Sequence, residues 1–388
     1  MTKSTKKPAV VVQGSGLNAL GVIRSLAPER VAIRLVDRQE GGPAIHSRYA
    51  KPQLYRCEDA DADDALIRSL QTAAQEFDAP PVLLLTQDAA VAAVSKHRAQ
   101  LAGTFRVELP DADTVADLTD KQRFQRRAEA LGFPVPRAVY VDDDVRSAST
   151  LTYPCILKPA RKSEHWERTY KKAYRFESFA DLETFWRGVE HKPPFIVQEW
   201  IEGGDADVYF TLVQRGADGT RIAFTGRKIR QWPLLVGGTA SCMPAPDVAA
   251  ELDKLTHRFF DAVGLIGLAS MEYKRDSRNG RFVMVEPTIA RTDYQEEVAT
   301  LNGINLVQAA YRSIAGLEPT PQHPATSPAI WRDATSDENA KAANPEAELP
   351  AEATGVRVVD AVFRTDDPGP WLQSQISRVR GRLRRMFR

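Results

Sequence analysis

The sequence predicts an α/β domain with a parallel sheet, followed by an α+β region. Apolar strands first alternate with helices; a capped, charged helix around Leu118–Gly132 then changes the pattern, and turn-linked strands run from Val139 to Ala315. The chain of 388 residues is also too long for one ordinary hydrophobic core, so we expect two or three domains.

The strands and helices of the first part follow one another in a regular order. They read PAVVVQG, LGVIRSLA, VAIRLVD, ALIRSLQTAAQEF and PPVLLLTQD. Alternation of this kind is typical of parallel strands in one sheet whose faces are covered by helices.

A glycine turn follows the first of these strands. Gly14, Gly16 and Gly21 resemble a dinucleotide-binding fingerprint, and Asp37 ends the second strand, where a ribose-binding acid would lie. The third glycine is displaced, because the G-x-G-x-x-G spacing would place it at Ala19. A nicotinamide-dependent oxidoreductase therefore stays open as an alternative.

The second region combines strands with fewer helices. The stretch LTDKQRFQRRAEALGFPVP predicts a helix that ends at a glycine and two prolines. We expect three further helices, at Phe179–Val189, Val248–Val263 and Leu306–Ile314. Pro319 to Pro350 has little periodicity and predicts a mobile or loosely packed linker, which a short strand, VRVVDAVF, and a basic tail follow.

Composition excludes several classes of protein. The 52 basic and 51 acidic residues nearly cancel, so no nucleic-acid partner is expected for the surface as a whole. Three widely separated cysteines form no metal-binding spacing and favour a reducing compartment. No apolar run precedes the first strand, and none reaches the roughly 20 residues that span a bilayer. We expect a cytoplasmic protein.

Two short apolar strands each carry an acid. Glu286 interrupts FVMVEPTIAR, and Glu272 interrupts LASMEYKRD. Acids rarely lie on a half-buried strand face without a partner, and bound magnesium usually joins one or two carboxylates to substrate phosphates. A surface hairpin with two exposed acids is the alternative that the strands alone leave open.

Two further stretches have a functional and a structural interpretation. Lys158 ends the apolar strand CILKPA, so it either meets an anionic ligand or extends its charge to water from a buried stem. In FIVQEWIEGGDADVYF, an adenine could lie near Glu199–Ile201, with its ribose hydroxyls on a carboxylate such as that of Asp207. The alternative is again a hairpin with exposed acids.

The order of these features resembles the ATP-grasp superfamily, and within it the carboxylate–amine ligases similar to D-aspartate ligase. The resemblance covers nearly all of residues 9–316 and rests on six blocks: TDKQRF, CILKPA, VQEWIEGGD, GRKIRQWP, SMEYKRD and VEPTIARTDYQEEVA. It implies a Rossmann-like pre-ATP-grasp domain (1–116), a two-subdomain ATP-grasp domain that clasps ATP (117–318), and a linker, short strand and basic amphipathic tail (319–388).

The resemblance also implies roles for individual residues. Nucleotide phosphates would contact Lys121, Lys158 and one lysine of the Lys171–Lys172 pair, for which we choose Lys172. The remaining roles would be the adenine hinge for Glu199, Trp200 and Ile201; the ribose for Asp207; magnesium for Glu272, Glu286 and Thr288; catalysis for Lys228, Arg230 and Arg291; and the substrate pocket for Gly16, Asn18, Asp88, Gly238 and Thr239.

The chain departs from the family pattern at three places. Thr288 stands where the family usually has a metal-binding asparagine, which leaves one or two magnesium ions open. Arg291 falls one residue later than the usual arginine, and the loop Ala160–Tyr170 lacks the glycines of a phosphate flap.

By resemblance, we expect an ATP- and Mg²⁺-dependent ligase that joins a carboxylate to an amine through an acyl phosphate, releasing ADP and phosphate. Its partners would be a small-molecule carboxylate and a small-molecule amine. We expect the substrate to be an amino acid or a small peptide. A non-catalytic ATP-binding module is the alternative. The oligomeric state stays open, a dimer included. The tail QISRVRGRLRRMFR predicts an amphipathic basic helix that either docks on the protein, stays disordered, contacts an anionic membrane surface peripherally or binds nucleic acid.

Overall fold

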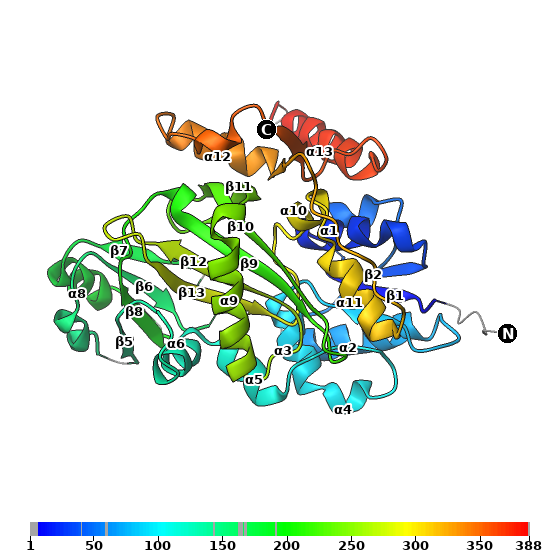
Figure 1. Ribbon diagram of the computed structural model, residues 1–388, viewed down its shortest axis with the longest axis horizontal. Coiled ribbons are helices and arrows are strands. Elements are labelled where there is room, and N and C mark those ends of the chain that lie inside the picture. Colours follow the sequence, from blue (N-terminus) through cyan, green and yellow to red (C-terminus); the bar gives the residue numbers. More distant parts are fainter. Residues whose placement is uncertain are drawn as a thin grey trace.

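The computed structural model describes residues 7–386 except 40, 59–60, 143, 162–165, 167–168 and 191. Its strands form three sheets, of four, seven and four strands. Figure 1 shows the seven-stranded sheet in the middle, the N-terminal domain on one side and the small sheet with α8 on the other.

The N-terminal domain has the predicted parallel sheet, in the order β3-β2-β1-β4. Val10, Val11 and Val12 of the central strand are fully buried because helices cover both faces of the sheet. The elements are β1 (Val10–Gln13), α1 (Leu17–Leu26), β2 (Ile33–Arg38), β3 (Lys51–Tyr55), α2 (Ala62–Ala74), β4 (Val82–Leu84), α3 (Asp88–Lys96) and α4 (Arg98–Leu101).

A small antiparallel sheet follows, in the order β5-β8-β6-β7. The charged helix predicted near residue 118 is α6, and Asp120 caps it by accepting hydrogen bonds from the N–H groups of Gln122 and Arg123. The elements are α5 (Ala112–Thr119), α6 (Lys121–Ala130), β5 (Ala138–Val141), β6 (Cys155–Pro159), β7 (Tyr174–Phe176), α8 (Phe179–Arg187) and β8 (Phe195–Glu199).

The large sheet has the order β13-β12-β9-β10-β11-β14-β15, antiparallel except for the last pair. Helix α9 lies across it (Figure 1) and buries Phe259 and Phe260. The elements up to residue 315 are β9 (Val208–Arg215), β10 (Arg221–Trp232), β11 (Gly238–Pro244), α9 (Pro246–Ala262), β12 (Gly267–Arg275), β13 (Phe282–Ile289), α10 (Glu297–Leu301) and α11 (Leu306–Ala315).

The prediction of a mobile or loosely packed linker at Pro319 to Pro350 is wrong for much of this range. Strand β14 (Ala329–Arg332) pairs with β11, and α12 (Ala334–Ala343) follows it. Trp331 is only 1% exposed and donates from Nε1 to Glu297, so burial outweighs the polar composition around it. Strand β15 (Arg357–Asp360) then extends the sheet, and α13 (Gly369–Met386) ends the described chain.

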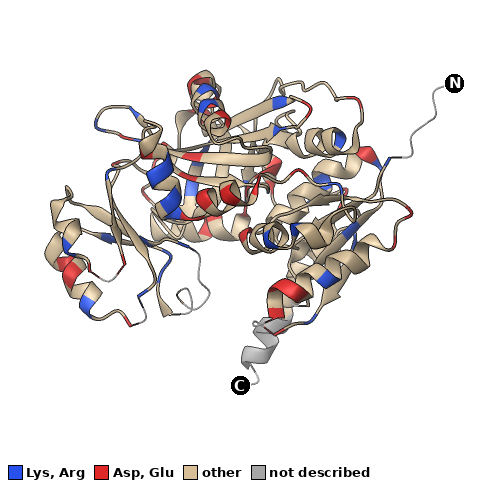
Figure 2. Cartoon of the chain, turned by 90° about the horizontal axis from the view of Figure 1, so that it is seen from below, with Lys and Arg blue, Asp and Glu red and all other residues tan. Residues whose placement is uncertain are grey.

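The first domain and the large sheet share one hydrophobic core. A single buried cluster includes Val11 and Leu70 from the first domain together with Tyr209 and Phe259 from the second region. Acidic and basic residues lie on all parts of the molecule (Figure 2), in line with the near-zero net charge. None of the described helices is long and apolar enough to cross a membrane.

Candidate active site

A cavity of about 380 Å³ lies between the small sheet and the large sheet. Strands β6 and β8 supply one wall, and β10, β12 and β13 supply the opposite wall. Most of the residues expected to bind nucleotide, metal or substrate or to act in catalysis line it. They are Lys121, Lys158, Lys172, Glu199, Trp200, Ile201, Lys228, Gly238, Thr239, Glu272, Glu286, Thr288 and Arg291.

Glu272 and Glu286 lie directly opposite each other on neighbouring antiparallel strands. The register is set by the pairing of β12 with β13, so two acids 14 positions apart in sequence become cross-strand neighbours. Lysines offset the repulsion between them. Lys228 Nζ lies 2.7 Å from Glu272, and Glu286 lies 3.4 Å from the amine of Lys121 and 3.8 Å from that of Lys172.

The two carboxylates fit a magnesium ion that shares its remaining positions with phosphate oxygens and water. Within the described residues, no group of three or more His, Cys, Asp and Glu side chains could hold a metal by itself. Thr288 is the cross-strand partner of Ser270, and both hydroxyls donate 2.7 Å hydrogen bonds to Asp293. Glu272 and Glu286 would therefore bind a magnesium ion whose other ligands include phosphate oxygens.

Lys158 lies at the end of β6 among charged groups. Burial lowers the pKa of its amine to about 8, an effect that the nearby carboxylate of Glu286 partly opposes. A lysine in such a place keeps a full charge more easily once an anion is beside it. Its neighbour Lys121 begins α6, where its backbone N–H donates to Ala160.

The other end of the cavity is apolar. Ile156, Ala173 and Trp200 form a small hydrophobic cluster with Val236 packed against it. The Glu199 carboxylate accepts a 2.8 Å hydrogen bond from the N–H of Thr152. Among the described residues, none accepts a hydrogen bond from the N–H of Ile201. A flat heteroaromatic ring fits this arrangement, with its edge on the main chain.

Five of the expected residues do not line the cavity. Asp207 caps a short turn by accepting from the Gly204 N–H at 2.8 Å, and Arg230 forms an ion pair with Asp337 at 3.1 Å. Asn18 donates to the carbonyl oxygens of Thr86 and Thr292, and Asp88 pairs with Arg291. Gly16 is the N-cap residue that precedes α1 in the first domain.

No protein-family model and no curated protein matches the sequence. Solved structures match the fold. An ADP complex of N5-carboxyaminoimidazole ribonucleotide synthetase aligns with a TM-score of 0.66 at 14% identity, over 85% of this chain and 82% of that chain. The Staphylococcus aureus N5-carboxyaminoimidazole synthetase with ADP gives 0.65 at 15% identity, over 85% and 83%.

A third match is the biotin carboxylase domain of Hydrogenobacter thermophilus 2-oxoglutarate carboxylase, solved with MgADP, ADP and bicarbonate. It aligns with a TM-score of 0.64 at 14% identity, over 83% of this chain and 72% of that chain. The chain has the ATP-grasp fold. The fold expected from the six sequence blocks is thereby confirmed.

Several residues of this ATP-grasp cavity were missed from the sequence. Asp293, Gln231 and Lys274 line it. Asp293 lies in the quoted block VEPTIARTDYQEEVA, five positions beyond Thr288, and this spacing could have suggested a third acid. Lys274 donates to the carbonyl oxygens of Gly203 and Gly204, and burial lowers its pKa, so it holds the chain beside the cavity.

The glycine turn of the first domain is filled by the protein itself. A side chain at Gly14 (φ +98°) would meet the Thr86 hydroxyl at 2.2 Å, and one at Gly42 would meet the Ser15 carbonyl at 2.4 Å. Asp37 accepts hydrogen bonds from the Ser15 hydroxyl and the Arg38 N–H. The acid expected for a nicotinamide ribose thus already has partners in the turn.

Proposed function

We propose that the protein is an ATP-dependent carbon–nitrogen ligase that joins a carboxylate to an amine and releases ADP and phosphate. The observation that carries this proposal is the cross-strand pair Glu272 and Glu286, surrounded by lysines in the cavity of an ATP-grasp fold. A chain without catalysis has little physical need to hold two acids this close together.

The nucleotide would lie along the length of the cavity. Adenine would occupy the apolar end beside Ile156 and Trp200, with its edge on the main chain of Glu199 and Ile201. The triphosphate would then extend towards Lys121, Lys158 and Lys172. Asp207 is too engaged in its own turn to be the first choice for the ribose.

Magnesium would be held by Glu272 and Glu286, and it would neutralise charge on the β- and γ-phosphates. The protein's own part is to position the reacting groups and to spread positive charge over the phosphates. Lys228 is 3% exposed, and its amine donates a 3.1 Å hydrogen bond to Gln231 and forms an ion pair with Glu272. These two contacts fix the position of the amine beside the carboxylate of Glu272.

The reaction has two balanced steps. A carboxylate oxygen attacks the γ-phosphorus, the bond to the β-phosphate oxygen breaks, and ADP leaves with an acyl phosphate behind. An amine nitrogen then attacks the acyl carbon, phosphate leaves, and the nitrogen loses a proton. Arg291 and Lys228 would stabilise the negative oxygen of the tetrahedral intermediate. Arg230 has no direct part in this scheme, because Asp337 holds its guanidinium outside the cavity lining.

The finer proposal is that the acid is an amino acid or a small peptide, on the grounds of the resemblance to D-aspartate ligase. Bicarbonate is the other donor to test, since the H. thermophilus domain was solved with it. Gly238 and Thr239 of β11 line the cavity and would border the acid and amine. The same role expected for Gly16, Asn18 and Asp88 has no support from the cavity lining.

The test measures ADP release with MgATP and a panel of acids, bicarbonate included, each with and without amines. We expect ADP release that depends on one acid, and a hydroxamate when hydroxylamine replaces the amine. ADP release independent of every acid and amine would contradict the proposal. ATP binding with no turnover under any condition would favour the non-catalytic module, and NADH binding without ATP binding would favour an oxidoreductase.

A further inference from the structure

We propose that helix α13 is a membrane-binding element that lies on an anionic lipid surface while the rest of the protein stays in water. The proposal is independent of the ligase assignment. It rests on three features of the C-terminal segment: how its base is fixed, which side chains it exposes, and the charge of its sequence.

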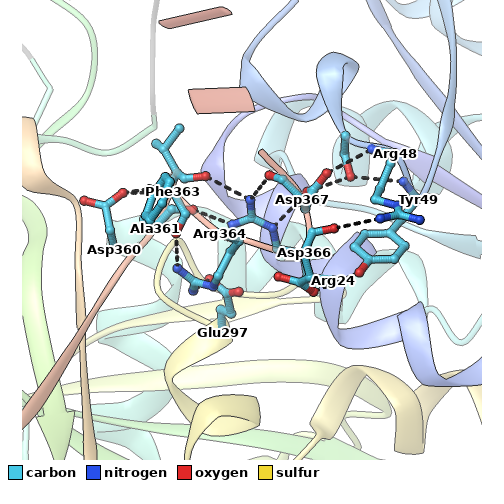
Figure 3. A network of polar contacts seen from close by, with 12 residues as sticks. Arg24, Arg48, Tyr49, Glu297, Asp360, Ala361, Phe363, Arg364, Asp366 and Asp367 are labelled. Carbon is cyan, nitrogen blue, oxygen red and sulfur yellow. Dashed lines mark hydrogen bonds and ion pairs between the residues drawn. The ribbon is translucent and has the colours of Figure 1, made fainter. Parts of the chain in front are cut away.

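The base of α13 is fixed to the first domain by buried polar contacts (Figure 3). The Asp367 side chain is fully buried and accepts from Arg24 Nε, the Ser47 hydroxyl and the Arg48 N–H, at 3.1, 2.9 and 2.9 Å. Arg24 also donates to the carbonyl oxygens of Ala361 and Val362. The helix therefore leaves the body of the protein at a defined place.

The start of the helix is also closely packed on the first domain. A side chain at Gly369 would meet the His46 carbonyl oxygen at 2.2 Å, so the first turn touches the segment Pro43–His46. Five residues before the helix, Arg364 forms an ion pair with Glu297 at 2.8 Å. These contacts involve the residues up to the first turn, whereas the side chains of Leu372, Ile376 and Val379 beyond it are exposed.

The exposed face of α13 is apolar. Leu372, Ile376 and Val379 are 50, 46 and 55% exposed, and their spacing of four and three places them along one side of the helix. At the base, the exposed rings of Phe363 and Trp371 pack edge to face, with centroids 5.3 Å apart. A tryptophan beside an aliphatic row is typical of helices that lie at a membrane interface.

The sequence around this face is strongly cationic. From residue 368 to the end it contains six arginines, at 378, 380, 382, 384, 385 and 388, and no acidic residue. The whole chain carries a formal charge of only +1, so this segment differs from the rest of the protein. A sequence that combines arginines with aliphatic residues complements anionic headgroups above acyl chains. A nucleic acid would use the charge but would leave Leu372, Ile376 and Val379 in water.

The experiment is co-sedimentation of the full-length protein with phosphatidylcholine vesicles that contain either no phosphatidylserine or about 30% of it. We expect pelleting with the anionic vesicles alone, and release when salt is raised to about 0.5 M. The variant L372E/I376E/V379E should lose about tenfold or more of the vesicle affinity.

A matched variant separates this effect from a change in net charge. L54E/L131E/L349E adds the same three negative charges at side chains that are 39, 38 and 48% exposed on other parts of the surface. It should bind vesicles within about twofold of the wild-type protein. Both variants should keep the wild-type thermal unfolding midpoint.

Three results would overturn the proposal. One is wild-type protein that stays in the supernatant with anionic vesicles at low salt. Another is an equal loss of binding in the two triple variants. The third is tight binding to single-stranded RNA with no binding to vesicles, which would assign the arginines to a nucleic acid.

Discussion

Arg291 donates from Nε to the carboxylate of Asp88, so a residue at the start of α3 holds a side chain that lines the ligand cavity. Asp88 belongs to the first domain, and Arg291 follows β13 of the large sheet. The pair connects the cavity wall that we propose binds the nucleotide with the first domain.

Removing the charge of Asp88 should impair catalysis more than ATP binding. In Asp88→Asn, Arg291 loses its ionic partner and its preferred orientation, so kcat should fall about 10- to 100-fold. The affinity for ATP, measured calorimetrically, should stay within about twofold. Asp37→Asn, in a turn of the same domain, is the control and should keep its kcat. A large loss of ATP affinity in Asp88→Asn would show that the contact shapes the nucleotide site instead.

Glu286→Gln should remove most turnover without unfolding the protein. The amide keeps the shape of the side chain but withdraws one charge from the pair that would hold magnesium, so kcat should fall about 100-fold or more. Titration of activity with magnesium checks the cause, because the variant should need more metal. Glu129→Gln is a control on α6, where Glu129 accepts from Tyr140 and Gln125 away from the cavity. Unchanged activity and metal dependence in Glu286→Gln would exclude a metal role.

The affinity for ATP should fall as pH rises through the pKa of Lys158. Burial lowers this pKa to about 8, so the amine is charged below that pH and becomes neutral above it in the free protein. Binding a triphosphate at about pH 9 must then take up a proton, which calorimetry in buffers of different ionisation enthalpy detects. Lys158→Arg should remove the proton uptake, because arginine stays charged. Equal uptake in both proteins would assign it to another group.

Lys158→Ala should weaken ATP binding about tenfold or more at pH 7, with less effect on carboxylate binding measured alone. The variant removes a cation from the end of the cavity that we propose binds the triphosphate, and it leaves the apolar end intact. Unchanged nucleotide affinity would mean that Lys158 only extends its amine to solvent.

Asp367→Ala should destabilise the protein far more than Asp366→Ala. Loss of Asp367 leaves the Arg24 side chain, which is only 7% exposed, without its ionic partner, at a cost of about 3 to 5 kcal/mol. Asp366 accepts a hydrogen bond from the Tyr49 hydroxyl at the surface. Its replacement should therefore lower the free energy of unfolding by less than about 1 kcal/mol. Urea unfolding of the two variants gives the comparison. Equal stabilities would mean that the C-terminal segment is not held by this network.

The two acids of the cavity wall could be predicted from the sequence, but the orientation of the basic residues on β10 could not. Glu272 and Glu286 could be found because each interrupts an apolar strand, and antiparallel pairing then made them neighbours. Lys228 and Arg230, two positions apart, were both expected to act in catalysis. The pairing of β10 with β11 is irregular between them, so Gln231 lines the cavity and Arg230 turns to Asp337. Such a bulge depends on the partner strand and leaves little mark on the local sequence.

Long-range pairing explains the largest error as well. The four residues of β14 stand in a stretch rich in proline, alanine and polar residues, so no local periodicity indicates a strand. The strand forms because Trp331 finds a buried site against Tyr294 and Glu297, both far away in sequence. The ribose role expected for Asp207 stays a prediction, and its carboxylate accepts a hydrogen bond from the Gly204 N–H in a local turn.

The position of β14 has a consequence for how the protein is made. The neighbours of this strand are β11, which precedes it by some 90 residues, and β15, which follows near the C-terminus. While the nascent chain is still on the ribosome, β11 therefore has an unpaired side, with main-chain N–H and C=O groups open to other chains. Strand β14 protects this side only after it has been synthesised, so termination before Ala329 should yield a product that self-associates through β11.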